Sequence, residues 1–217
     1  TILRDINLTI PRGQLLTILG HNGSGKTTLV KILSTLLRPD QGTVHIAGLD
    51  ISANRKQIRR IIGVVTHSPF LYDQLTGYEN LKFTGRIFGL NNLEDRISSV
   101  ANQFDLTTRL HQQSGILSHG IRKRLSIAKA LIHDPEILLM DEPDTGLDQK
   151  ALDMLHTVFS NHTNSCRTIL TTTHNLDQPI AMNYKLAFLS QGRISHQMSV
   201  DSTTSPKFMK EAYSHYT

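Results

Sequence analysis

The chain has 217 residues, a formal net charge of +5, 38% apolar residues and 19% charged residues, a profile typical of one globular domain or of one domain with a subdomain. No apolar run approaches the ~20 residues that a membrane span needs. The single cysteine, Cys166, excludes an intrachain disulfide framework and fits a reducing compartment. The mild positive charge leaves nucleic acid, an anionic membrane or neither open as partners.

Short apolar runs alternate with amphipathic stretches, which is typical of a mixed α/β fold. The patterns predict strands at residues 14–19, 43–46, 61–66, 136–140, 168–172 and 186–189. They predict helices at residues 27–37, 78–88, 92–104, 121–132 and 149–161. Helical patterns dominate residues 68–115, so we interpret this segment as an insert in a core formed by 1–67 and 116–200, within a single domain of 1–217. Residues 200–217 are polar and weakly patterned, and we interpret them as a C-terminal tail.

The segment Gly20–Thr27 matches the phosphate-loop pattern G-x-x-x-x-G-K-[ST] in full, between a predicted strand and a predicted helix. Its glycines let the backbone curl around a phosphate chain, and the helix points its positive dipole end at the same phosphates. We expect Lys26 to reach the β- and γ-phosphates and the Thr27 hydroxyl to bind Mg²⁺. An ordinary glycine-rich turn is the alternative, and the full motif in this context favours nucleotide binding. The predicted phosphate-binding residues are Gly20, His21, Asn22, Gly23, Ser24, Gly25, Lys26, Thr27 and Thr28.

Two carboxylates, Asp141 and Glu142, follow the apolar run 137–140 at the carboxyl end of a predicted strand, where side chains of an open α/β sheet face the ligand crevice. Asp141 is a candidate Mg²⁺ ligand, and Glu142 is a candidate general base for an attacking water. A simpler interpretation is that the two acids are solvated residues before a turn at Pro143. The presence of a phosphate loop in the same chain favours the catalytic interpretation instead. His174 ends another apolar strand and is a candidate for sensing or stabilising the γ-phosphate.

Ser118 precedes a basic amphipathic helix at residues 121–132. It is either an ordinary helix N-cap or the start of a second phosphate-binding helix terminus. The sequence alone does not distinguish these two roles.

These segments, in this order, resemble the ATP-binding subunit of ABC transporters over nearly the whole chain, from Ile2 to about His196. Residues 117–122 (LSHGIR) are similar to the family signature LSGGQ followed by a basic residue. Residues 146–148 (GLD) resemble the D-loop, which assigns Asp148 to it, and His174 resembles the switch histidine.

The resemblance implies a P-loop NTPase of the ABC type, an α/β fold with a mostly parallel core sheet, an antiparallel β element and a helical subdomain insert, with ATP and Mg²⁺ as cofactors. It implies a head-to-tail homodimer or heterodimer formed on ATP binding, in which Ser118, His119 and Gly120 of one copy close over the ATP of the other. ATP turnover would drive separate integral membrane subunits, contacted through residues 70–88, with no direct nucleic-acid partner. The chain would then be peripheral, at the cytoplasmic face of the inner membrane.

Three departures from the family pattern stand out. His67 occupies the Q-loop position, where the family has glutamine. In the signature, His119 replaces a glycine and Ile121 replaces a glutamine. The family stacks adenine on an upstream aromatic residue, whereas residues 1–19 contain no Phe, Tyr or Trp, so we expect that aromatic to precede Thr1 in the natural chain.

A narrower resemblance is to the CcmA-type ATPases of haem exporters in cytochrome c maturation, and it rests on His67, residues 69–81 and the altered signature. One alternative is another ABC-2-type exporter ATPase, for a lipid, a drug or a polysaccharide. A second is a soluble ABC ATPase that acts on nucleic acid or ribosomes. A third is a degenerate cassette without turnover, which the catalytic set of Lys26, Asp141, Glu142 and His174 disfavours.

Overall fold

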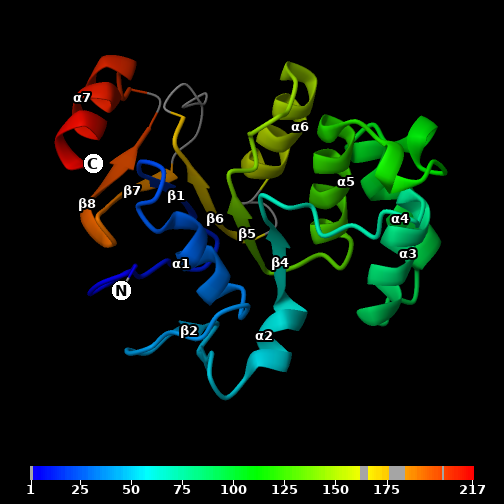
Figure 1. Ribbon diagram of the computed structural model, residues 1–217, viewed down its shortest axis with the longest axis horizontal. Helices are drawn as coiled ribbons and strands as arrows, with labels where there is room; N and C mark the ends of the chain where they lie inside the picture. Colours follow the sequence, from blue (N-terminus) through cyan, green and yellow to red (C-terminus); the bar gives the residue numbers. More distant parts are fainter. Residues whose placement is uncertain (1, 162–165, 176–183, 202) are drawn as a thin grey trace.

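A computed structural model describes residues 2–161, 166–175, 184–201 and 203–217 of the chain. Within them, a six-stranded sheet has the order β4-β5-β6-β1-β7-β8 (Figure 1). Its strands are β1 (Leu15–Leu19), β4 (Ile62–Val65), β5 (Ile137–Asp141), β6 (Thr168–Thr173), β7 (Tyr184–Ser190) and β8 (Arg193–Val200). The neighbours from β4 to β7 pair in parallel, and β8 pairs antiparallel with β7. A separate antiparallel ribbon pairs β2 (His45–Ile46) with β3 (Leu49–Asp50), so the expected mostly parallel sheet with an antiparallel element is confirmed.

Helices connect the strands and cover the sheet. They are α1 (Lys26–Leu33), α2 (Arg55–Ile61), α3 (Gly77–Ile87), α4 (Leu93–Gln103), α5 (His119–Leu131), α6 (Gln149–Ser160) and α7 (Pro206–Tyr216). Short 3-10 turns lie at Thr107–Arg109 and Ser114–Ile116. No helix among the described residues is long and apolar enough to cross a membrane.

The central strands β1 and β5 are mostly apolar on both sides because both faces of the sheet are covered there. Leu16 and Ile18 of β1 pack on the face covered by α1, α2 and the β2–β3 ribbon. Leu15 of the same strand packs on the opposite face, with side chains of α3, α4, α5 and α6. This alternation follows from strand geometry, since successive side chains point to opposite faces. Because β1 and α1 pack into the same buried cluster, they fix both ends of the phosphate-loop segment that connects them.

The segment 68–115 contains α3 and α4, which contact each other and α5 (Figure 1). α3 begins with a capping box, in which the Thr76 hydroxyl accepts a hydrogen bond from the Glu79 N–H and the Glu79 carboxylate accepts one from the Thr76 N–H. The division into a core and a helical insert stays a prediction about domain organisation.

Residues 200–217, which we interpreted as a polar C-terminal tail, contain a helix that was not predicted, because Pro206–Tyr216 form α7. Ser205 caps this helix by accepting a hydrogen bond from the Phe208 N–H at 3.2 Å, and a proline occupies its first turn. Met209 and Ala212 are buried against β7 and β8. A serine–proline pair followed by apolar residues at helical spacing was the signal in the sequence.

The edge strand β8 was also not predicted. It follows β7 through a two-residue turn at Gln191 and Gly192, whose φ angles of 46° and 79° match the turn that suits a twisted hairpin. Its residues alternate between exposed and half-buried, and the polar ones hide the strand pattern. The helix expected at 27–37 stops at Leu33, because Thr35 adopts a left-handed φ of 64°.

Candidate functional site

The loop between β1 and α1 has the conformation of a phosphate cradle. Gly25 precedes α1 with a φ of 112°, which is strained for any residue with a Cβ. A Cβ on Gly20 would lie 2.4 Å from the carbonyl oxygen of Leu189, so the close approach of β7 also demands glycine. The N-terminal turn of α1 follows directly, and its free N–H groups and dipole face the loop.

Lys26 lies beneath this loop with only 5% of its side chain exposed. Its Nζ donates hydrogen bonds to the carbonyl oxygens of Gly20 at 2.7 Å and His21 at 3.1 Å. The same ammonium lies 3.5 Å from Oε1 of Glu142. The structure therefore brings the predicted phosphate-loop lysine and the predicted general base together.

Asp141, the last residue of β5, is 1% exposed and accepts two side-chain hydrogen bonds. The hydroxyl of Thr27 donates to Oδ2 at 2.7 Å, and the hydroxyl of Thr172 donates to Oδ1 at 2.8 Å. The two residues predicted as Mg²⁺ ligands, Thr27 and Asp141, are thus in contact although 114 positions separate them. A hydroxyl and a carboxylate are hard oxygen donors of the kind that Mg²⁺ prefers, so the residues present fit this ion.

Glu142 leaves the strand with a left-handed φ of 47°, which costs a residue with a Cβ about 1–2 kcal/mol. Its N–H donates to both the carbonyl and the hydroxyl oxygen of Thr172, at 3.1 and 3.2 Å. Its carboxylate Oε1 lies 3.0 Å from Nδ1 of His174. Strained backbone conformations are often found at functional sites. They persist only where the surrounding structure holds the residue in place.

The predicted catalytic residues Lys26, Glu142 and His174 therefore form one cluster, with Oε1 of Glu142 between the other two. The Glu142 side chain is 17% exposed, and that of His174 is 46% exposed. A carboxylate next to an ammonium and an imidazole is suited to accepting a proton from a water that they help to orient.

The predicted signature residues lie apart from this cluster. Ser118 caps α5, and its hydroxyl accepts a hydrogen bond from the Ile121 N–H at 3.4 Å. Ser118 and His119 are exposed, and Gly120 is half-buried. No hydrogen bond or ion pair between described residues joins these three to the phosphate loop of their own chain.

The predicted D-loop residue Asp148 caps α6 by accepting a hydrogen bond from the Ala151 N–H at 2.8 Å. The D-loop touches the signature, since a Cβ on Gly146 would lie 2.5 Å from Nδ1 of His119. His67, at the predicted Q-loop position after β4, is exposed. In the described part of the chain, no hydrogen bond or ion pair links His67 to the catalytic cluster.

Four residues that contribute to the site were not predicted from the sequence. Thr172 bonds both acidic residues, and a run of threonines at the end of an apolar strand was the signal for it. Lys123 of α5 is 2% exposed and donates to the main-chain carbonyl of Glu142 at 3.0 Å, although its basic neighbours suggested a surface position. Tyr213 of α7 and Thr217, which follows that helix, place hydroxyl oxygens 3.2 and 3.1 Å from the two ring nitrogens of His21.

Residues 3–145 match the ABC transporter family. The chain belongs to this family. It is an ABC-type ATPase, and its ATP-binding cassette architecture agrees with the resemblance seen in its motifs.

The relatives of this ABC ATPase include three bacterial proteins that are each more than 30% identical to it. The ABC transporter ATP-binding protein NatA of Bacillus subtilis is 34% identical over 92% of the chain and 82% of the relative. The Nod factor export ATP-binding protein I of Cupriavidus pinatubonensis is 36% identical over 88% of the chain and 60% of the relative. The doxorubicin resistance ATP-binding protein DrrA of Mycobacterium tuberculosis is 34% identical over 88% of the chain and 59% of the relative. The chain therefore spans most of NatA and somewhat less than two thirds of the other two.

Solved structures support the same family. An ATP-binding subunit of an ABC transporter superposes with a TM-score of 0.89, at 25% identity, over 98% of this chain and 93% of that one. A dimeric ATP-binding cassette in a post-hydrolysis state with ADP and Pi superposes with a TM-score of 0.82, at 26% identity, over 91% and 90% of the two chains. These similarities extend through β6, β7 and β8, beyond the residues that match the family.

Proposed function

We propose that this ABC ATPase drives an exporter by hydrolysing ATP with Glu142 as the general base. The observation that carries this proposal is the position of Oε1 of Glu142, 3.5 Å from the Lys26 ammonium and 3.0 Å from the His174 ring. In this arrangement Glu142 accepts a proton from the attacking water, while His174 helps to orient that water or the γ-phosphate. The water oxygen bonds to the γ-phosphorus, and the bond from phosphorus to the ADP oxygen breaks.

The phosphate loop and its neighbours bind the rest of the nucleotide in this proposal. Backbone N–H groups of residues 20–28 surround the phosphates, and Lys26 binds the β- and γ-phosphate oxygens. Thr27 and Asp141 would hold Mg²⁺, which neutralises charge on the phosphates when bound. Thr172 orients Asp141 through its hydroxyl, at 2.8 Å.

A second copy completes the site in this proposal. Ser118 and His119 are exposed, and no hydrogen bond between described residues joins them to the phosphate loop of their own chain. Both residues are therefore free to contact the ATP of a partner subunit. Gly146 of the predicted D-loop lies against His119 and Gly120, and Asp148 caps α6 two residues further along the chain. The dimeric cassette that resembles this chain supports such an assembly.

The names of the relatives support an exporter of the ABC-2 type. One is a Nod factor export protein and another is a doxorubicin resistance protein, and none of the three names mentions haem. We therefore favour a substrate of the broader class, a lipid, a drug or a polysaccharide. Haem export stays a prediction that rests on His67, residues 69–81 and the altered signature.

The membrane subunit would dock on an apolar surface along α3. Tyr72, Phe83 and Ile87 are 54%, 43% and 67% exposed, and we call them the α3 apolar surface. The rings of Tyr72 and Phe83 meet edge to face at 5.2 Å, and Ile87 follows Phe83 by one helical turn. Exposed apolar residues that gather in this way mark interaction sites.

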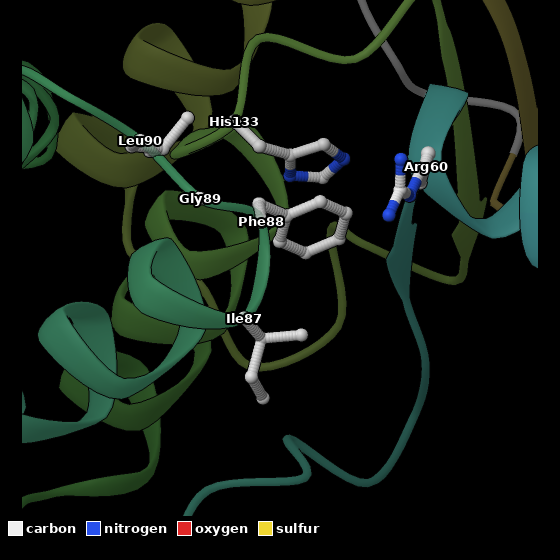
Figure 2. Close-up of a pocket in the computed structure, with 6 residues that line it drawn as sticks. All are labelled: Arg60, Ile87, Phe88, Gly89, Leu90 and His133. Atoms are coloured by element: carbon white, nitrogen blue, oxygen red, sulfur yellow. The ribbon is translucent and has the colours of Figure 1, made fainter.

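A pocket of about 390 Å³ adjoins this surface at Ile87. Figure 2 shows the rings of Phe88 and His133 face to face, with the Arg60 side chain across the opening. The other lining residues are Ile87, Gly89 and Leu90. A short amphipathic helix of the membrane subunit, with an acidic group for Arg60, would fill such a pocket.

The docking proposal is tested by co-purification with membrane proteins from the natural host. Phe83→Glu and Ile87→Glu should each abolish co-purification of an integral membrane protein and leave ATP binding intact. Phe208→Glu is the matched control, because Phe208 is also apolar and 50% exposed but lies on α7. Retention of the membrane protein by both α3 variants would remove this surface from the proposal. Salt-sensitive RNA in place of a membrane protein would favour the nucleic-acid alternative.

The catalytic proposal is tested by two substitutions. Glu142→Gln should keep ATP affinity and abolish turnover, because the amide cannot accept the water proton. Lys26→Ala should weaken ATP binding by about 10- to 100-fold, since it removes a charge-assisted hydrogen bond worth about 1.5–3 kcal/mol. Lys31→Ala, on an exposed turn of α1, is the control and should change neither quantity. Ordinary phosphate release by Glu142→Gln would show that Glu142 is not the base.

A further inference from the structure

Lys123 is a buried cation inside the catalytic region that none of the proposed roles uses. It lies in α5, the helix that Ser118 caps, and it is 2% exposed. Its Nζ donates a hydrogen bond of 3.0 Å to the main-chain carbonyl of Glu142. The contact therefore joins the helix that begins at the signature to the residue proposed as the general base.

The surroundings of Lys123 are acidic. Burial lowers the pKa of Lys123 from its ordinary value of 10.5, and the charges of three carboxylates oppose that shift: Asp144, Asp141 and Glu142. Asp144 also has a buried oxygen, Oδ1, without a hydrogen-bond partner among the described residues, while its Oδ2 accepts from Thr173 at 3.2 Å. The charges of these carboxylates therefore favour the protonated lysine, which donates its hydrogen bond to Glu142.

The main chain of Glu142 needs such support because its φ of 47° is unfavourable for a residue with a side chain. The N–H side of the residue is fixed by Thr172, through its carbonyl and hydroxyl oxygens. The carbonyl side is fixed by Lys123. With both peptide groups held, the carboxylate is directed at Lys26 and His174.

We propose that Lys123 is a positioning residue that holds Glu142 in its left-handed conformation and ties this conformation to the position of α5. Because Ser118 caps the same helix, a shift of the signature on closing over a partner's ATP moves Lys123, and with it the carbonyl of Glu142. The position of the general base then depends on the position of the helix that begins at the signature. This inference rests on the proposed role of Glu142 and adds a physical link between that residue and the signature.

The test compares Lys123→Met with Arg124→Met in steady-state ATP hydrolysis. Methionine keeps the unbranched shape of lysine but removes the charge and the donors. Arg124 is a matched control, because it too donates to main-chain carbonyls, those of Phe104 and Asp105, but away from the catalytic cluster. Lys123→Met should lower kcat by about 10- to 100-fold through misplacement of Glu142 and leave KM for ATP within about twofold. Arg124→Met should leave kcat and KM unchanged.

A second measurement separates positioning from general destabilisation. If Lys123 acts through Glu142, adding Lys123→Met to Glu142→Gln should not lower the residual single-turnover rate further, because the base is already absent. Lys123→Arg, which keeps a buried cation and its donors, should restore part of kcat. If Lys123→Met does not fold, Lys123→Leu takes its place, since leucine also lacks the charge and the donors, and the same two expectations apply.

Three results would overturn the inference: an unchanged kcat in Lys123→Met, an equal loss in Arg124→Met, or the same fold-loss in the presence and absence of Glu142→Gln. Failure of the proposed function looks different. In that case Glu142→Gln by itself retains turnover, whatever Lys123 does.

Discussion

Asp141 and Glu142 are adjacent carboxylates with separate surroundings. Asp141 is buried at a strand end and accepts hydrogen bonds from two threonine hydroxyls. Glu142 turns out of the strand towards an ammonium and an imidazole. Environment rather than residue type therefore distinguishes the proposed metal ligand from the proposed base, as in other enzymes with paired acids.

His133 gives a residue-scale prediction for stability against pH. Its Nε2 donates to the carbonyl of Ile62 at 3.0 Å, and its ring stacks on Phe88 with centroids 3.7 Å apart. Burial lowers the pKa of His133 from 6.5 to about 4. Between these pH values the unfolded chain binds more protons than the folded one, so this group makes stability fall as the pH drops from 6.5 towards 4.

The expected loss from His133 is about 2 kcal/mol of unfolding free energy between pH 7 and pH 4.5. Urea unfolding of the wild type and of His133→Gln at both pH values measures it. The variant does not titrate here, so its acid sensitivity should be smaller by that amount. Parallel losses in the two proteins would show that His133 is not responsible.

At the scale of elements, α5 carries three consecutive cations near its start. Arg122 donates to the carbonyl of Ser114 at 2.8 Å and to the Asp73 carboxylate at 2.7 Å. Lys123 and Arg124 also donate to main-chain carbonyls, as described above. These three consecutive cations therefore serve the internal structure, and the sequence pattern of a basic amphipathic helix does not mark a surface for an acidic partner.

The helix α7 gives an element-scale prediction. Met209 is 2% exposed and packs in a cluster with Phe188 and Val200, whereas the adjacent Phe208 is 50% exposed. Met209→Ala should lower the unfolding free energy by about 2–4 kcal/mol, because it leaves a cavity between α7 and the sheet. Phe208→Ala should change it by less than about 0.5 kcal/mol. Urea unfolding at neutral pH measures both, and equal effects would contradict the packing described here.

At the scale of the whole molecule, the order of the strands assembles the site. β5, β6 and β1 are neighbours in the sheet and run parallel. The segments at their carboxyl ends carry Asp141, His174 and the phosphate loop, so three distant parts of the sequence meet at one edge. The strand order also leaves Ser118 and Asp148 to cap helices away from this cluster.

The assembly gives a prediction for the whole molecule. With ATP and Mg²⁺, Glu142→Gln should run as a dimer in light scattering coupled to gel filtration, because bound ATP is not consumed. Adding Ser118→Glu should keep the chain monomeric while ATP still binds, since a carboxylate would face the γ-phosphate of the partner. Ser98→Glu, at an exposed serine of α4, is the matched control and should not prevent the dimer. A dimer that survives Ser118→Glu would exclude Ser118 from the interface.

The sequence by itself determined the phosphate loop, the acidic pair and the mixed α/β class, and the resemblance to ABC ATP-binding subunits added the mostly parallel sheet. The first three are local patterns: glycine spacing between a strand and a helix, an apolar run ending in two acids, and short apolar runs that alternate with amphipathic stretches. Local patterns are readable because the residues that cause them are neighbours in the chain. The family membership of the chain followed from the same motifs.

Only the tertiary structure decided the contacts between those patterns. The bond from Lys123 to the carbonyl of Glu142 and the contacts of α7 with His21 join residues far apart in the chain, and no spacing rule encodes them. The strand β8 depends on pairing with β7, since its own alternation is mostly polar. Burial and long-range hydrogen bonds arise only once the chain has folded, which is why the contact of Lys123 with Glu142 could not be predicted from the sequence.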